Sequence, residues 1–138
     1  MRVFVDTNVL FSGLYSLHGT PNKILEAAAA LAIQLVISVD VLQELTRNIH
    51  HKAPHLVGDL NRFLLDTTVE IVATPPDHET QRWIDAALGS DAAIIAAALH
   101  ARVDYFCTGD KRVLGRGRRG DLGGLEVISP AALLRLLR

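Results

Sequence analysis

The sequence predicts an α/β protein with a mainly parallel central sheet, and three observations lead to this fold class. Short apolar segments typical of buried strands recur along the chain. Helical segments separate them, which is the connection that parallel strands require. No repeat or low-complexity linker divides the 138 residues, so we expect a single domain over residues 1–138.

The predicted strands are short and apolar. The first stops at Asp6, and the two residues after it also favour a turn, because their short polar side chains hydrogen-bond to nearby backbone. A carboxylate therefore follows directly on the end of a strand. In chain order the predicted strands cover residues 2–5, 33–38, 69–73, 104–109 and 125–129.

The predicted helices occupy the connections between the strands. Thr20 is placed as an N-cap with Pro21 at the first helical position, and Pro130 is placed at the start of the last helix. Residues 91–101 are apolar on nearly every face, which indicates a buried helix. In chain order the predicted helices cover residues 9–15, 21–32, 39–51, 55–66, 77–88, 91–101 and 130–138.

Composition excludes several classes of protein. The single cysteine, Cys107, cannot form an internal disulfide, which favours a reducing compartment, and we expect the cytoplasm. No apolar run is long enough to span a membrane. The net charge is −1, so a polyanion would have to be attracted by a local basic patch or by a metal ion.

Acidic residues fall at the edges of the predicted buried elements. Asp6 and Asp110 each follow a strand, Glu44 lies one turn into a helix beside its apolar stripe, and Asp91 begins the all-apolar helix. Taken singly, each is more often structural than functional, as a turn residue, a helix-end residue or, for Glu44, an ordinary helical glutamate. Parallel sheets, however, place their sites at the carboxyl ends of the strands, where the strand order reverses. Four carboxylates gathered there would repel one another unless a cation or protons neutralise them, and oxygen ligands of this kind suit Mg²⁺ or Mn²⁺.

A basic, glycine-rich stretch follows Asp110. Its cations are candidates for contacts with phosphates, and the alternative is a solvated basic loop, because the glycines indicate mobility. The candidate residues for binding RNA are Lys111, Arg112, Arg116, Arg118 and Arg119.

Four segments in this order resemble the PIN-domain ribonucleases, and in particular the PIN-family toxins (VapC-like) of bacterial toxin–antitoxin pairs. The segments are "VFVDTNVLFSG", "ISVDVLQEL", "SDAAIIAAAL" and "DYFCTGDKRVL", which together extend over nearly the whole chain. The resemblance implies a three-layer α/β/α fold. It also matches Asp6, Glu44, Asp91 and Asp110 to the family's acidic quartet, with Asn8 and Thr108 as polar supports that orient the carboxylates.

The function implied by this resemblance is a Mg²⁺- or Mn²⁺-dependent endoribonuclease acting on single-stranded RNA, as the toxin of a pair with a cognate antitoxin. A homodimer formed through an apolar helical face is also expected. The last segment reads "TGDKRVLG" where many VapC-type toxins have Thr-x-Asn-x-x-Asp-Phe, so Asp110 would contact metal either directly or through water.

The residues also bear on other functions. A dinucleotide-binding fold is disfavoured, because the first strand leads into "DTNVLFSG" with no Gly-x-Gly-x-x-Gly. The alternative from a different class is a PIN-like domain without turnover that serves as an RNA-binding or protein-interaction module. The intact set of acids argues against that alternative.

Overall fold

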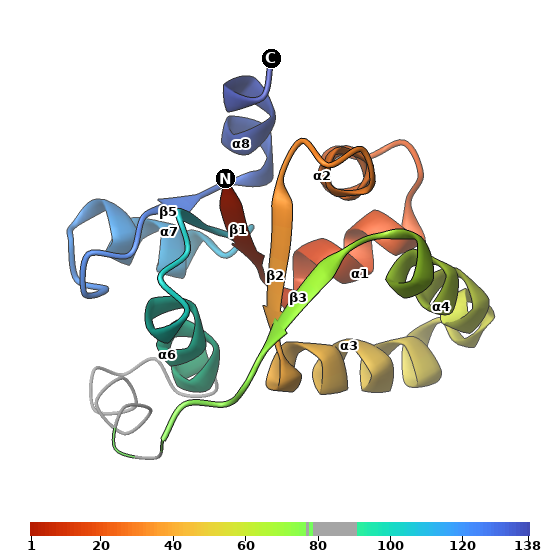
Figure 1. Ribbon diagram of the computed structural model, residues 1–138, viewed down its shortest axis with the longest axis horizontal. Coiled ribbons are helices and arrows are strands. Elements are labelled where there is room, and N and C mark those ends of the chain that lie inside the picture. Colours follow the sequence, from red (N-terminus) through yellow and green to blue (C-terminus); the bar gives the residue numbers. More distant parts are fainter. Residues whose placement is uncertain (77, 79–90) are drawn as a thin grey trace.

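The computed structural model describes residues 1–76, 78 and 91–138, and within that part the chain forms a five-stranded parallel sheet with helices on both sides (Figure 1). Every neighbouring pair of strands is parallel, and the order is β3-β2-β1-β4-β5. The α/β fold expected from the sequence is therefore confirmed. The strands are β1 (Arg2–Val5), β2 (Gln34–Ser38), β3 (Val69–Val72), β4 (Tyr105–Cys107) and β5 (Val127–Ile128).

The helices form two layers around this sheet. Figure 1 shows α1, α2 and α4 on one side of the strands and α6 and α7 on the other, while α8 packs against α2. The helices are α1 (Thr7–Tyr15), α2 (Thr20–Ala29), α3 (Val39–Lys52), the 3-10 turn η1 (Pro54–Leu56), α4 (Val57–Asp66), α6 (Ala92–His100), α7 (Lys111–Arg118) and α8 (Pro130–Leu136). None of the helices in the described ranges has the length and apolar character needed to cross a bilayer.

The strand order reverses between β1 and β4. The chain leaves β1 toward β2 and β3 on one side, and it returns to β4 and β5 on the other side of β1. Pairing continues past the strand ends, since the Asp6 amide donates to the Cys107 carbonyl at 3.0 Å. The residues that follow β1 and β4 therefore lie side by side at the carboxyl edge of the sheet, where ligands of parallel sheets bind.

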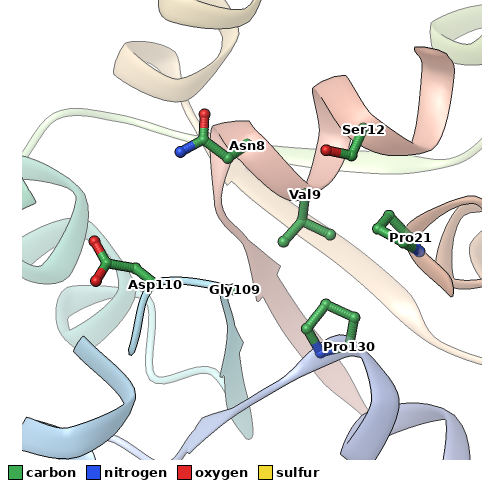
Figure 2. A pocket seen from close by; sticks show the side chains of 7 residues that line it. All are labelled: Asn8, Val9, Ser12, Pro21, Gly109, Asp110 and Pro130. Atoms are coloured by element: carbon green, nitrogen blue, oxygen red, sulfur yellow. The ribbon is translucent and has the colours of Figure 1, made fainter. Parts of the chain in front are cut away.

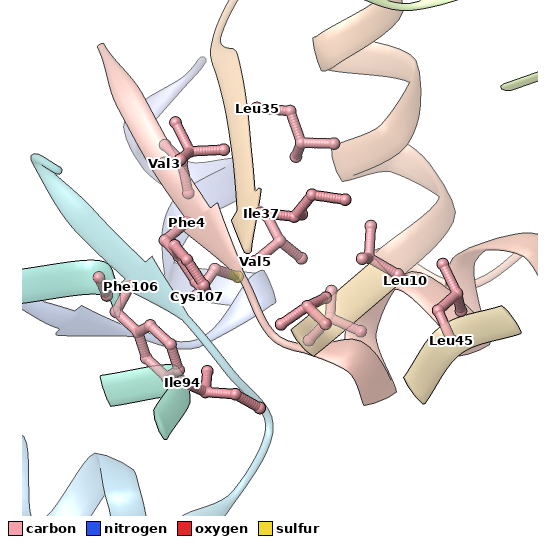
Figure 3. Close-up of a cluster of buried hydrophobic side chains, with 14 of the residues drawn as sticks. Val3, Phe4, Val5, Leu10, Leu35, Ile37, Leu45, Ile94, Phe106 and Cys107 are labelled. Atoms are coloured by element: carbon pink, nitrogen blue, oxygen red, sulfur yellow. The ribbon is translucent and has the colours of Figure 1, made fainter. Parts of the chain in front are cut away.

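Apolar side chains from the central strands hold this edge in place (Figure 3). Val3, Phe4 and Val5 are fully buried, and the Phe4 ring stacks on Phe106 with centroids 5.5 Å apart. Helix α6 adds a nearly continuous apolar surface, with Ile95 fully buried. The expectation of a buried helix after residue 91 is confirmed, and its packing anchors the preceding residue beside the sheet.

The boundaries of the first helices differ from the predictions. Helix α1 begins at Thr7 rather than at residue 9, because Asp6 already takes the extended N-cap conformation. The prediction of Thr20 as an N-cap is wrong by one residue, since Gly19 is the cap and Thr20 is helical. Helix α2 ends at Ala29 because the left-handed Leu31 (φ 62°) closes a Schellman motif. The helix predicted over residues 77–88 lies outside the described residues.

The basic stretch after Asp110 is a helix, so the alternative of a mobile loop does not hold for residues 111–118. Asp110 is its N-cap and accepts from the amide of Arg112 at 2.9 Å, while Val113 is buried beneath the first turn. The glycine at 117 serves close packing: a Cβ there would lie 2.7 Å from the Val127 side chain. Helix α7 therefore presents its arginines from an ordered surface.

Candidate active site

Asp6 is the centre of the candidate site and is held by its neighbours on β4. It lies at the junction of β1 and α1, and its amide donates to β4 as described above. Its Oδ2 accepts a hydrogen bond of 2.8 Å from the hydroxyl of Thr108, which is fully buried. Backbone and side chain are thus both fixed, so the orientation of this carboxylate is set by the fold.

Thr108 also joins Asp6 to Asp110. Its Oγ1 donates to Asp6 and accepts from the Asp110 amide at 3.1 Å. A hydroxyl can do both at once, whereas a methyl group of the same shape could do neither. The segment 108–110 is therefore tied to the end of β1 through one buried oxygen atom.

Burial and two neighbouring acids act on the Asp6 carboxylate. The pKa of Asp6 is raised from its usual 3.8, mainly because burial disfavours the charged form. The hydrogen bonds from Thr108 and from the backbone oppose this rise, and the negative charges of Asp91 and Glu44 add to it. Asp91 and Glu44 therefore lie close enough to Asp6 to disfavour its charged form.

An arginine enters this acidic group. Asp91 lies directly before α6, and its Oδ2 is 2.6 Å from Nη2 of Arg112 in the first turn of α7. The Arg112 side chain is 58% exposed and that of Asp91 is 30% exposed, so the pair lies at the rim of the site. Nothing in the sequence indicates this pair, because the two residues are 21 positions apart and belong to different elements.

Asp110 has a different environment from the other three acids. Its Oδ1 accepts from the amides of Arg112 and Val113, at 2.9 and 3.4 Å, as the cap of α7. The same residue lines a pocket of about 320 Å³ (Figure 2). Asn8, predicted to support the carboxylates, is exposed and lines this pocket too, and among the described residues no hydrogen bond joins its amide to any of the four acids.

The remaining wall of this pocket includes residues that sequence analysis did not single out. Val9 and Ser12 line it from α1, Gly109 lies beside Asp110, and Pro21 and Pro130 close it from α2 and α8 (Figure 2). The spacing of Asn8 and Ser12, four residues apart on one helix, was the available signal. The part played by the two prolines depends on tertiary packing.

The other predicted RNA-binding residues lie on or just after α7. Lys111 begins the helix beside Arg112, and both are exposed. Arg118 and Arg119 are also exposed, and Arg119 forms an ion pair of 3.2 Å with Asp121. Arg116 is partly buried. The basic residues nearest the acids are therefore those of the first turn of α7.

The side chains near Asp6 have the chemistry, but not the spacing, of a site for a hard divalent cation. Within residues 1–76, 78 and 91–138, no three acidic, histidine or cysteine side chains are gathered tightly enough to ligate one ion as they stand. Carboxylate oxygens nevertheless dominate, and the charged form of Asp6 is disfavoured mainly by burial and further by two acidic neighbours. Asp6, Asp91 and Glu44 are the residues that could hold the ion, with Asp110 adjacent.

The thiol of Cys107 lies behind this acidic group. It is fully buried, as expected for a core residue, and burial together with the nearby Asp6 raises the pKa of the thiol to about 12. At the opposite edge of the sheet Asp104 accepts a hydrogen bond from the Arg2 amide at 2.7 Å, so this acid lies away from the site.

Fold and site together define a class: a parallel α/β domain with an acidic site where the strand order of its sheet reverses. Comparison with protein families identifies which one, because the PIN domain model matches residues 2–112. The chain belongs to the PIN domain family, whose members are generally nucleases.

Solved structures share this fold. The structure of VapBC2 from Rickettsia felis, bound to a DNA fragment from its promoter, has a TM-score of 0.68 and 18% identity, covering 94% of this chain and 98% of that one. PAE2754 from Pyrobaculum aerophilum has a TM-score of 0.67 and 20% identity, covering 99% of this chain and 98% of that one. Comparison with curated proteins gives no significant match.

Proposed function

We propose that this PIN-domain protein is a metal-dependent endoribonuclease that cuts single-stranded RNA. The observation that carries the proposal is the position of Asp6, a half-buried carboxylate whose pKa is raised by burial and by the charges of Asp91 and Glu44. A protein keeps such repelling acids together at a strand end when the site neutralises them with a cation. The proposed catalytic and metal-binding residues are Asp6, Glu44, Asp91 and Asp110.

The metal would supply the chemistry that the carboxylates lack: bound Mg²⁺ or Mn²⁺ lowers the pKa of a water molecule and stabilises charge on the leaving oxygen. The chain's own residues prepare the site. Thr108 keeps the Asp6 carboxylate oriented through its 2.8 Å hydrogen bond, and the cap at Asp110 fixes the start of α7 beside it. Asp110 would contact the ion directly or through water.

Helix α7 is the proposed surface for the RNA backbone. Its first turn brings Lys111 and Arg112 next to the acids, and phosphate contacts of this kind position a strand without reading its sequence. Arg116, Arg118 and Arg119 extend the basic surface away from the site. Unpaired RNA is the favoured substrate, because its bases can turn out of the strand, whereas an A-form duplex hides their edges.

In the cell we infer the role of a toxin paired with a cognate antitoxin. The likeness in fold to VapBC2 of Rickettsia felis supports this inference. The antitoxin would inhibit by placing a basic or amphipathic segment against the acidic site. The cytoplasm is the proposed location, and an apolar helical face is the proposed contact of a homodimer.

The experiment that tests the enzymatic proposal is cleavage of labelled single-stranded RNA with Mg²⁺, with Mn²⁺ and with EDTA. Asp6→Asn and Asp91→Asn are compared with Asp66→Asn, which removes an exposed carboxylate at the end of α4, at the opposite edge of the sheet. We expect metal-dependent cutting that both site variants lose and the control keeps. Equal cutting by all variants would contradict the proposal, and RNA binding without cutting would favour the module without turnover.

A further inference from the structure

The pocket between α1 and the segment 108–110 shares its walls with the acidic group. Asp6 caps α1, and the pocket is lined by the next two turns of that helix, at Asn8, Val9 and Ser12. On the other side, Thr108 binds Asp6 while its neighbours Gly109 and Asp110 line the pocket. A strand of RNA crossing the acids would therefore meet this pocket next.

We propose that this pocket receives one unpaired base of the RNA strand, beside the phosphate that is cut. The inference rests on the proposed function and adds to it a binding site for the nucleotide next to the cut. It makes the pocket, and not the basic surface of α7, the part of the molecule that recognises a base.

The chemistry of the walls favours a flat neutral group over a phosphate. Val9, Pro21 and Pro130 offer apolar surface, and no lysine or arginine is among the described residues of the lining. The charged side chain among these residues is the Asp110 carboxylate, which would repel an anion. A base has an apolar face and a polar edge, so it can pack against the apolar side chains and hydrogen-bond to the polar groups of the lining.

The polar groups of the pocket can bind the edge of a base. Asn8 carries both donors and an acceptor in its amide, and Ser12 adds a hydroxyl one turn further along α1. Both residues are exposed, and Figure 2 shows them projecting from the same helix. Unpaired bases in RNA are bound in this way, by stacking together with hydrogen bonds to their edges.

The size of the pocket limits its occupant. Its volume of about 320 Å³ is at the lower end of the range of small-molecule sites. One base fits this space better than a stacked pair. The pocket would therefore impose a preference at one position of the RNA, while the contacts of α7 remain independent of sequence.

The experiment measures binding and cutting of short fluorescent oligoribonucleotides in which a single abasic residue is moved along the strand. Binding is followed by anisotropy in EDTA, and cutting in Mn²⁺. The variant Ser12→Leu fills the pocket from an exposed helical position, and Ser16→Leu is its control, since Ser16 is also exposed but lies at the end of α1, outside the lining.

We expect one abasic position, next to the cut, to weaken binding to the wild-type protein by about 5- to 100-fold. Ser12→Leu should weaken binding of the intact strand by a similar factor. This variant should lose no further affinity when the abasic residue stands at that position. Ser16→Leu should behave as the wild type. If the abasic residue weakens binding equally at every position, as expected if the pocket instead takes a side chain of a partner protein, the inference is overturned. It is also overturned if the losses of affinity from Ser12→Leu and from the abasic residue add together. If the protein cuts RNA but no abasic position matters more than another, only this inference fails. If one abasic position weakens binding but the protein does not cut RNA, only the nuclease proposal fails.

Discussion

Nη2 of Arg112 lies 2.6 Å from Oδ2 of Asp91, and this ion pair joins the first turn of α7 to the residue that precedes α6. Asp91 is one of the two acids whose charge raises the pKa of Asp6. Arg112 therefore offsets part of the negative charge at the site from a side chain that is itself a candidate for binding RNA. Its two possible partners, an acid of the site and a phosphate, compete for one guanidinium.

The first prediction concerns this competition. Arg112→Gln leaves Asp91 without its cation, so Mn²⁺ should bind about 2- to 5-fold more tightly in a calorimetric titration, the amount expected from an exposed ion pair. Lys111→Gln removes an equal charge from the neighbouring residue and should change the affinity less. Weaker Mn²⁺ binding in Arg112→Gln than in Lys111→Gln would contradict the prediction.

The second prediction concerns the buried hydroxyl of Thr108. Thr108→Val removes the bonds to Asp6 and to the Asp110 amide, and we expect a loss of about 1–3 kcal/mol in the free energy of unfolding, because buried polar groups lose their partner. Cutting of RNA should fall as well, since Asp6 is no longer oriented. Thr108→Ser keeps the hydroxyl, so its cutting of RNA should be closer to that of the wild type than its free energy of unfolding is. If valine and serine variants cut equally well, the hydroxyl does not orient the acid.

The third prediction is the pH dependence of Asp6. Because its pKa is raised in the folded state, the charged carboxylate destabilises the fold at neutral pH, and this penalty disappears as the pH falls through the raised pKa toward the unfolded value of 3.8. Asp6→Asn should therefore melt at a higher temperature than the wild type at pH 7, with a gap that narrows on acidification. Melting curves between pH 4 and pH 8 without added metal measure this difference in melting temperature. A difference that grows as the pH falls would contradict the prediction.

The fourth prediction compares two glycines of α7. Gly117→Ala forces a Cβ to within 2.7 Å of the Val127 side chain, and we expect it to destabilise the fold by about 1–3 kcal/mol. Gly115→Ala is the matched control, because the nearest atom is the flexible end of Arg119 at 3.8 Å, and it should stabilise by about 0.5–1 kcal/mol through helix propensity. Urea unfolding of both variants gives the difference, and an equal response at the two positions would show that α7 does not pack closely on β5.

Local sequence signals predict the strands and the place of Asp6 because both depend on short-range chemistry. The apolar run at 2–5 forms β1, and the polar residue that ends it becomes the cap of α1. Helix α7 is harder to predict for a physical reason. Asp110 is both a candidate site acid and the helix cap, and Gly117, which in a sequence suggests mobility, instead allows close packing on Val127 of β5.

The residues that form the site are harder to predict from the sequence than the fold is. Each of Asp6, Asp91 and Glu44 follows or borders a buried element, which is why the sequence suggests this group, and the charges of Asp91 and Glu44 act on Asp6 in the structure. The ion pair of Arg112 and the prolines of the pocket could not be predicted, because they depend on how α2, α7 and α8 pack around the sheet. Periodicity in one segment carries no information about such contacts.

The burial of Cys107 provides a chemical reporter within the protein. Thiol reagents attack the thiolate, and a side chain that is fully buried with a pKa of about 12 presents almost none of it at neutral pH. Its carbonyl accepts a hydrogen bond from the Asp6 amide, so we expect the sulfur to gain access to solvent when β4 separates from β1. The rate at which iodoacetamide modifies the chain's single cysteine therefore measures how often the edge that holds the acids opens, without any label being introduced.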